Sequence, residues 1–148
     1  ELLPKIDLKN ENLKNNAGGY YNHNVYFNSL GGKKFEQPKD TLMSTIKRDF
    51  GSFDNFVAQF KNTAYKQNSS GWTWLVVTKS GQLLVCSTQN LENPLMPRQV
   101  VKGTPILALD LWEHAYYPDY QFNRRKYIDD FTNSINWKMV SKAYEKTL

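Results

Sequence analysis

The chain has 148 residues, a net charge of +5 and a pI of about 9.2, with 40% apolar and 22% charged residues. This length suits one domain with a hydrophobic core, and no apolar run approaches the ~20 residues that a membrane-spanning helix needs. Its one cysteine, Cys86, excludes an internal disulfide and four-cysteine zinc or iron–sulfur sites.

The N-terminal part has a helical pattern. Residues 1–12 are polar and weakly patterned, which is typical of an arm or a cut helix. From Ala17 onward, apolar residues recur at helical spacing until Gly31 and Gly32 end the pattern. We therefore expect His23 on the apolar face of a helix. The residues expected to share that face are Tyr20, His23, Phe27 and Leu30.

Two shorter helices are predicted next. Pro38 opens the first of them, and Gly51 breaks it. Ser52 is placed to cap the following helix. The inward residues are expected to be Leu42, Met43, Ile46 and Phe50 in the first helix, and Phe53, Phe56, Val57, Phe60 and Ala64 in the second.

The pattern changes to strands at Gly71. Residues 72–78 are β-branched and aromatic, residues 79–82 read as a hairpin turn, and residues 83–88 read as the return strand, with Cys86 as a core thiol. After a loop rich in Asn and Pro, residues 104–109 predict a third strand that carries Asp110 at its end.

The C-terminal part is predicted to be helical again. The residues expected inward are Tyr127, Ile128, Phe131, Ile135, Val140 and Tyr144, and Asn136 is a candidate cap for the last helix. Helices therefore flank a small three-stranded antiparallel sheet, which is an α+β architecture and not a doubly wound fold.

Asp110 and His114 lie four residues apart, directly after the apolar run from Ile106 to Leu109. Ionisable groups are costly there unless each has a partner, and a metal ion is one such partner. The chain has only one other histidine, His23. Two imidazoles and a carboxylate suit a redox-capable iron or manganese centre, although zinc accepts the same atoms.

Bulky rings are frequent near these positions in the sequence. They would limit access to small molecules and shape the potential of a metal, although ordinary core packing explains any single ring equally well. The rings are those of Tyr20, Tyr21, Tyr26, Phe27, Trp72, Trp74, Trp112, Tyr116 and Tyr117.

The positive charge has three readings. It can steer a small anionic substrate, lie against RNA or an acidic partner, or form a solvated basic surface. The lysines are scattered, with no run of five or more, which favours the solvated surface.

The motifs together resemble the iron/manganese superoxide dismutase family. Residues 110–117 read Asp-Leu-Trp-Glu-His-Ala-Tyr-Tyr, which is similar to that family's signature. Residues 15–23 read Asn-Asn-Ala-Gly-Gly-Tyr-Tyr-Asn-His and resemble its second metal-binding segment in the manganese-type spelling. Further landmarks follow in order across nearly the whole chain: Gly71–Leu75, Pro94–Met96, Asn123–Arg125 with Tyr127, and Ile135–Trp137.

The resemblance implies a fold and a site. Residues 1–32 would be part of an N-terminal helical hairpin that carries His23, and residues 33–148 the family's α+β C-terminal domain. The implied metal ligands are His23, Asp110 and His114, around one manganese or iron ion per chain. The implied pocket residues are Tyr26, Trp72, Trp74 and Trp112. Glu113 and Tyr117 would lie in the interface of a homodimer, with Glu113 reaching His114 of the partner subunit.

The sequence departs from the family pattern at three places. The family's first histidine ligand, on an N-terminal helix, is not among these residues. The family's glutamine near the metal-bound solvent corresponds to Gly19 or Leu91 here, and Gln89 lies two residues from the second position. The Gly-Ser-Gly-Trp run of many relatives reads Ser69-Ser-Gly-Trp here. We therefore expect an impaired or incomplete dismutase as the sequence stands.

Two functions follow from the resemblance. The first is disproportionation of superoxide to oxygen and hydrogen peroxide. The alternative is a catalytically inactive, dismutase-like structural subunit of a large assembly such as the mitochondrial ribosome, with protein and RNA neighbours and no metal. The manganese-type spelling and the cationic balance favour a mitochondrial location over a cytoplasmic one, and no membrane span is expected.

Overall fold

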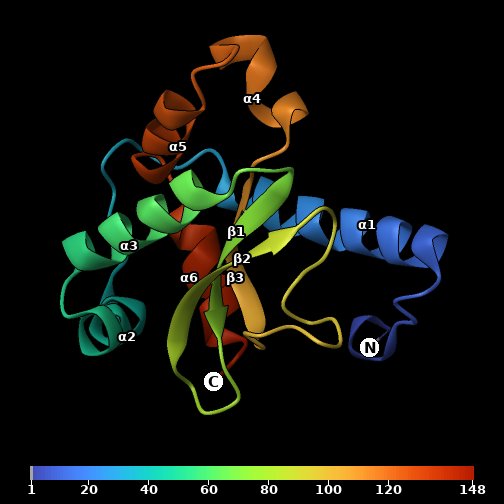
Figure 1. The fold of residues 1–148 in the computed structure, drawn as a ribbon. Helices are drawn as coiled ribbons and strands as arrows, with labels where there is room; N and C mark the ends of the chain where they lie inside the picture. Colours follow the sequence, from blue (N-terminus) through green and yellow to red (C-terminus); the bar gives the residue numbers. More distant parts are fainter. Residues whose placement is uncertain (1) are drawn as a thin grey trace.

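The computed structural model describes residues 2–148, in which six α-helices surround a three-stranded sheet (Figure 1). After a 3-10 turn, Leu3–Lys5, the order of elements is helical, then β, then helical again. The elements are α1 Glu11–Ser29, α2 Asp40–Phe50, α3 Phe53–Lys66, β1 Gly71–Val77, β2 Leu83–Gln89, β3 Thr104–Asp110, α4 Glu113–Tyr120, α5 Arg124–Thr132 and α6 Trp137–Glu145. The α+β prediction is confirmed.

The sheet is antiparallel in the order β2-β1-β3. The hairpin turn between β1 and β2 contains Gly81 at φ 87°, a conformation that glycine adopts without steric cost. β1 is central and buried along its whole length, as expected for its run of aromatic and β-branched residues. The register pairs Trp72 directly with Asp110, so their side chains leave the same face of the sheet.

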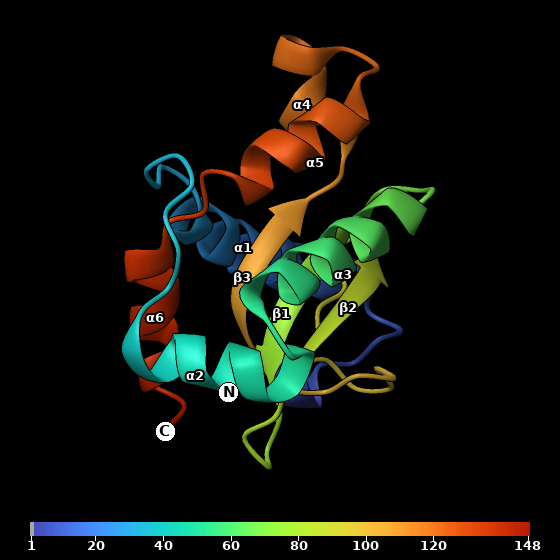
Figure 2. The ribbon, with the colours of Figure 1, turned by 90° about the vertical axis from the view of Figure 1, so that its left-hand side faces the viewer.

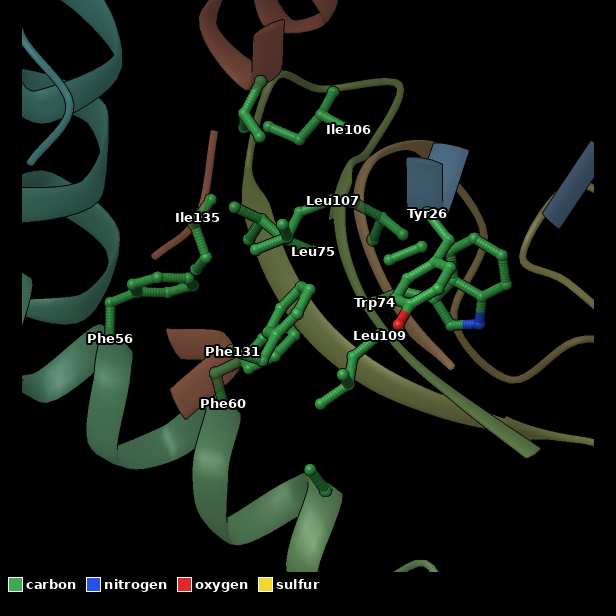
Figure 3. Close-up of a cluster of buried hydrophobic side chains, with 14 of the residues drawn as sticks. Tyr26, Phe56, Phe60, Trp74, Leu75, Ile106, Leu107, Leu109, Phe131 and Ile135 are labelled. Carbon is green, nitrogen blue, oxygen red and sulfur yellow. The ribbon is translucent and has the colours of Figure 1, made fainter. Parts of the chain in front are cut away.

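Helices cover both sides of the sheet. α3 packs against β1 and β2, whereas α1 and α6 pack against β3, and α3 and α1 lie on opposite sides in Figure 2. Figure 3 shows Phe56 and Phe60 of α3 directed towards Leu75 and Leu107 of the sheet. Asp110, the last residue of β3, is held by its pairing with Trp72 of the central strand β1.

Several capping predictions are confirmed. The Ser52 side chain accepts a hydrogen bond from the backbone N–H of Asn55, 3.0 Å away, at the start of α3. The Asn136 side chain accepts one from Met139 at 3.2 Å at the start of α6.

Cys86 is half-buried in β2, and burial raises the pKa of its thiol to about 12. None of the helices in residues 2–148 is long and apolar enough to cross a membrane.

The prediction for the first helix was wrong in its start and in its buried face. α1 begins at Glu11, where the Asn10 side chain caps it by accepting from Leu13. Tyr20 and Phe27, expected inward, are 76% and 62% exposed. The buried positions are Gly18, Asn22, Tyr26 and Ser29. Polar side chains can occupy this face because distant backbone groups satisfy their hydrogen bonds.

Two smaller differences concern the positions that were expected to be inward in α2 and α3. Met43 and Phe50 of α2 and Phe53 and Val57 of α3 are only partly buried, while Thr45 is buried. Thr45 can be buried because its hydroxyl bonds the Thr41 carbonyl at 2.9 Å and the Tyr144 hydroxyl at 2.8 Å.

Candidate metal centre

The structure brings together the three side chains predicted as metal ligands. One ligand atom from each of His23, Asp110 and His114 lies within 4.8 Å of the others. Asp110 Oδ2 is 2.9 Å from His114 Nε2 and 3.5 Å from His23 Nε2. His23 comes from the middle of α1, Asp110 ends β3, and His114 lies in the first turn of α4. Residues 87 positions apart therefore converge on one point (110 − 23).

The spacing of these atoms fits a metal ion. Ligand atoms about 2.0–2.2 Å from a common ion lie roughly 2.8–3.8 Å apart when the angle between them at the ion is 90–120°. The two distances to Asp110 Oδ2, 2.9 and 3.5 Å, lie within that range. The third distance, between the ligand atoms of the two histidines, is at most 4.8 Å. Two imidazoles and one carboxylate suit iron, manganese or zinc.

The burial of the Asp110 carboxylate also favours a bound cation. Asp110 is 1% exposed, and within residues 2–148 its ion-pair partners are the two histidines alone. Burial raises the pKa of its carboxyl, while hydrogen bonds from the Trp112 N–H and from His114 act in the opposite direction. Because a buried carboxylate is costly without compensating charge, a bound metal ion would stabilise its ionised form.

Backbone groups orient two of the candidate ligands. His23 Nδ1 lies 2.7 Å from the Gly19 carbonyl oxygen, so the proton on Nδ1 is donated there and Nε2 is left with its lone pair towards Asp110. Asp110 Oδ1 accepts from the Trp112 backbone N–H at 2.9 Å, which leaves Oδ2 for the site. Such outer contacts are typical of metal ligands, because they fix tautomer and orientation.

The predicted aromatic residues lie around the site in layers. Trp72 meets the His23 ring edge-on, with centroids 5.2 Å apart, and Trp112 stacks on His114 at 6.0 Å. Trp74 lies one ring further out, stacked on Trp72 at 5.8 Å, and Trp72 also meets Tyr26 edge-on at 6.0 Å. The Trp72 indole nitrogen is buried and has no hydrogen-bond partner among the residues that the structure describes.

Two tyrosines form a chain of hydrogen bonds to the backbone at the end of β3. The Tyr127 hydroxyl donates to the Asp110 carbonyl oxygen at 2.7 Å, so the Tyr26 hydroxyl, 2.8 Å from it, donates to Tyr127. Burial is the largest cause that raises the pKa of both phenols. Both therefore remain neutral donors at physiological pH. Tyr26 thus reaches the ligand residue through Tyr127 and does not touch a ligand atom itself.

The two positions at which the resemblance places a glutamine are neighbours in space. A Cβ built on Gly19 would lie 3.7 and 3.9 Å from the two terminal methyl groups of Leu91. An apolar side chain therefore lies one helical turn before His23, where the resemblance predicts an amide. Gln89 ends β2 and is exposed.

Glu113 and Tyr117, predicted for a dimer interface, are exposed on α4 beside His114. The His114 side chain is itself 57% exposed and that of His23 33%, so the site opens to the surface at this side.

Sequence reasoning missed three groups around the site. Tyr127 was expected only as an inward residue and a landmark, Asn22 appeared only within the motif of residues 15–23, and Asn93 was not noted. Both asparagines are fully buried, Asn22 on the helix that carries His23 and Asn93 hydrogen-bonded to it. The position of Asn22 beside His23 and at helical spacing from Tyr26 could have indicated it.

Comparison with known proteins identifies relatives of the whole chain. The family profile for the C-terminal domain of iron/manganese superoxide dismutases matches residues 38–143. The chain is 43% identical over its full length to superoxide dismutase (Mn) of Acinetobacter baylyi, of which it spans 65%. It is 42% identical to superoxide dismutase (Mn/Fe) of Methylomonas sp. strain J, with 99% of the chain and 73% of that protein aligned.

A third relative is superoxide dismutase (Mn) of Escherichia coli O157:H7, 45% identical over 97% of the chain and 71% of that protein. The chain thus spans about two thirds of the length of these relatives. The profile match covers more than half of the chain and includes Asp110 and His114. The chain belongs to the iron/manganese superoxide dismutase family.

Proposed function

We propose that this chain takes part in the disproportionation of superoxide to oxygen and hydrogen peroxide at one manganese or iron ion. The observation that carries the proposal is the convergence of His23 and His114 on the buried Asp110 carboxylate, whose ion-pair partners among residues 2–148 are these two histidines alone. The relatives named as manganese or manganese/iron superoxide dismutases support the same metals.

His23, Asp110 and His114 would hold the ion. The chemistry that a bound manganese or iron ion supplies is cycling between the +2 and +3 states, by which two superoxide anions and two protons become O₂ and H₂O₂. The Gly19 carbonyl keeps the proton of His23 on Nδ1, and the Trp112 N–H holds Asp110 Oδ1. Trp72 and Trp112 limit the space beside the imidazoles, so small molecules are favoured over large ones.

We also propose that a homodimer forms through α4. Glu113, His114 and Tyr117 are exposed on this helix next to the site. In a two-fold pair, Glu113 would approach His114 of the partner subunit, and its carboxylate would orient that imidazole. Analytical ultracentrifugation of Glu113→Gln tests this pairing, since unchanged dimer affinity would count against it.

The structural-subunit alternative receives no support from the three relatives, each of which is named as a dismutase. The expectation of impaired activity stays a prediction, because it depends on the rate that the metal-loaded chain achieves. The mitochondrial location also stays a prediction, for which fractionation of the native cells is the test.

The proposal is tested by superoxide decay in stopped-flow mixing with the chain after loading with manganese or iron. Decay should accelerate in proportion to the bound metal. Asp110→Asn, which keeps the side-chain shape, should lose metal affinity by more than the roughly 10–100-fold that loss of a supporting residue costs.

The matched control is Asp129→Asn on α5, where the carboxylate bonds Tyr65 and lies 3.3 Å from Lys61 Nζ. This variant should keep metal and activity. Superoxide decay that is unaffected by the metal-loaded chain, or equal in wild type and Asp110→Asn, would contradict the proposal.

A further inference from the structure

Two buried asparagines join α1 to the loop that follows β2. Asn22 and Asn93 are both 0% exposed, and Asn93 Nδ2 donates to Asn22 Oδ1 at 3.0 Å. Asn22 Nδ2 in turn donates to the carbonyl oxygens of Leu91, at 3.1 Å, and Glu92, at 3.3 Å. Asn93 Oδ1 accepts from the Leu95 backbone N–H at 3.0 Å. A satisfied network of this kind in a low-dielectric interior favours one arrangement of the segments that it joins.

The same helix has a second anchor further along. Ser29 is 1% exposed, and its hydroxyl accepts from the Ala108 backbone N–H of β3 at 3.2 Å while donating to the Val25 carbonyl at 2.8 Å. The helix is therefore held by polar contacts on both sides of His23. The close approach of Gly18 to the loop, where a Cβ would lie 2.2 Å from the Leu91 carbonyl oxygen, leaves little room for α1 to shift.

These anchors determine the direction of a metal ligand. His23 follows Asn22 directly, and its imidazole extends from the helix axis, so a small rotation of α1 moves Nε2 through a larger arc. Ligand distances in metal sites vary by only about 0.2 Å. For one metal ion to bind both residues, His23 Nε2 must stay close to Asp110 Oδ2. These two atoms are 3.5 Å apart in the structure. The three residues can therefore bind one metal ion only over a narrow range of rotation of α1 about its axis.

We propose that Asn22 and Asn93 are a positioning pair that holds α1 in the rotation directing His23 Nε2 towards Asp110. The pair touches no ligand atom and acts through the helix. This inference rests on the proposed metal site and adds to it a determinant of metal affinity located in the loop after β2.

The test uses Co²⁺ as a spectroscopic probe of the full 148-residue chain. Asn93→Leu keeps the branched shape and the number of side-chain heavy atoms but removes the amide that donates to Asn22. Its Co²⁺ dissociation constant should rise by roughly 10–100-fold, as for loss of a residue that orients a ligand, and its visible ligand-field bands should shift. If Asn93→Leu does not fold, Asn93→Ser is smaller, also removes the amide and should change both quantities in the same direction.

The matched control is Tyr144→Phe, which removes a buried hydrogen bond of 2.8 Å to Thr45 between α6 and α2. It should lower thermal stability comparably and leave the Co²⁺ affinity and bands unchanged. If Asn93→Leu and Tyr144→Phe behave alike, the positioning role is overturned while the metal site stands. If the wild-type chain binds Co²⁺ no more tightly than Asp110→Asn does, the proposed metal site fails and the positioning role fails with it.

Discussion

The Asp110 carboxylate lies 2.9 Å from the His114 imidazole across the junction between β3 and α4. Asp110 and His114 are four residues apart, but they do not lie on one turn of a helix, because Asp110 is the last residue of a strand. One carboxylate oxygen accepts from the Trp112 N–H and shapes the chain reversal, and the other faces His114. One aspartate thus both forms the turn and offers a ligand atom.

Tyr127→Phe is expected to destabilise the chain and weaken metal binding. It removes the donor to the Asp110 carbonyl and leaves the buried Tyr26 hydroxyl without the partner to which it donates. Loss of a buried partner costs about 1–3 kcal/mol. Urea unfolding and metal titration measure the two effects. Tyr26→Phe should cost less, about 0.5–1.5 kcal/mol, because the Tyr127–Asp110 bond remains; equal costs would contradict this order.

Two adjacent glycines in α1 should respond oppositely to alanine. In Gly18→Ala the new Cβ would lie 2.2 Å from the Leu91 carbonyl oxygen, so we expect a loss of about 1–3 kcal/mol in the free energy of unfolding. In Gly19→Ala the Cβ meets only methyl groups at 3.7 Å or more, and a gain of about 0.5–1 kcal/mol is expected from helix propensity. Chemical denaturation of both variants checks the contrast, which a loss in both would refute.

Leu91→Gln should change the metal site by placing an amide where the chain has methyl groups. Since Leu91 lies against Gly19, one turn before His23, the amide can bond solvent at the site. An orienting residue of this kind affects activity by about 10–100-fold. We therefore expect at least about a tenfold faster superoxide decay per bound metal than in the wild-type chain. Leu91→Met is the apolar control, and equal rates in both variants would show that the amide is irrelevant.

The Arg48–Asp49 ion pair at the end of α2, where Asp49 also accepts from the Leu83 N–H of β2, should give stability that depends on pH. The hydrogen bond from Arg48 is the largest cause that lowers the pKa of Asp49, and the Leu83 N–H adds to it. A lowered folded-state pKa means that the contribution is complete above the unfolded value of about 3.9 and is lost as pH falls through the folded value.

Asp49→Asn should therefore lower the free energy of unfolding at pH 7 and have a smaller effect near pH 3. Urea unfolding at the two pH values measures this difference. Glu145→Gln, an exposed carboxylate on α6 without a recorded ion pair in the described chain, should be near neutral at both. An Asp49→Asn effect that is the same at both pH values would exclude the ionic contribution.

Local patterns predicted most of the fold. The apolar stripe of α3, its Ser52 cap and the Asn136 cap of α6 are encoded within a few residues, and the structure has them. The hairpin of β1 and β2 follows from β-branched runs around a turn that contains Gly81. In each case the interactions that form the element lie within the segment itself.

The buried face of α1 could not be predicted in the same way. Asn22 and Ser29 are buried because Leu91, Glu92, Asn93 and Ala108 satisfy them, and these partners lie 69 to 79 residues away. Tyr20 and Phe27 are apolar yet exposed, so hydrophobicity alone selected the wrong side. His23 was nevertheless proposed as a candidate ligand, because histidine is scarce in the chain and the motif that it ends resembles a known metal-binding segment, and the structure places it beside Asp110.

The central claim is that His23, Asp110 and His114 close around one manganese or iron ion. Anomalous scattering from a crystal of the metal-loaded chain, collected at the absorption edge of that metal, tests it most directly. We predict a single strong peak about 2.0–2.2 Å from His23 Nε2, Asp110 Oδ2 and His114 Nε2. A peak that lies elsewhere, or density showing the three side chains packed together without an ion under saturating metal, would contradict the account.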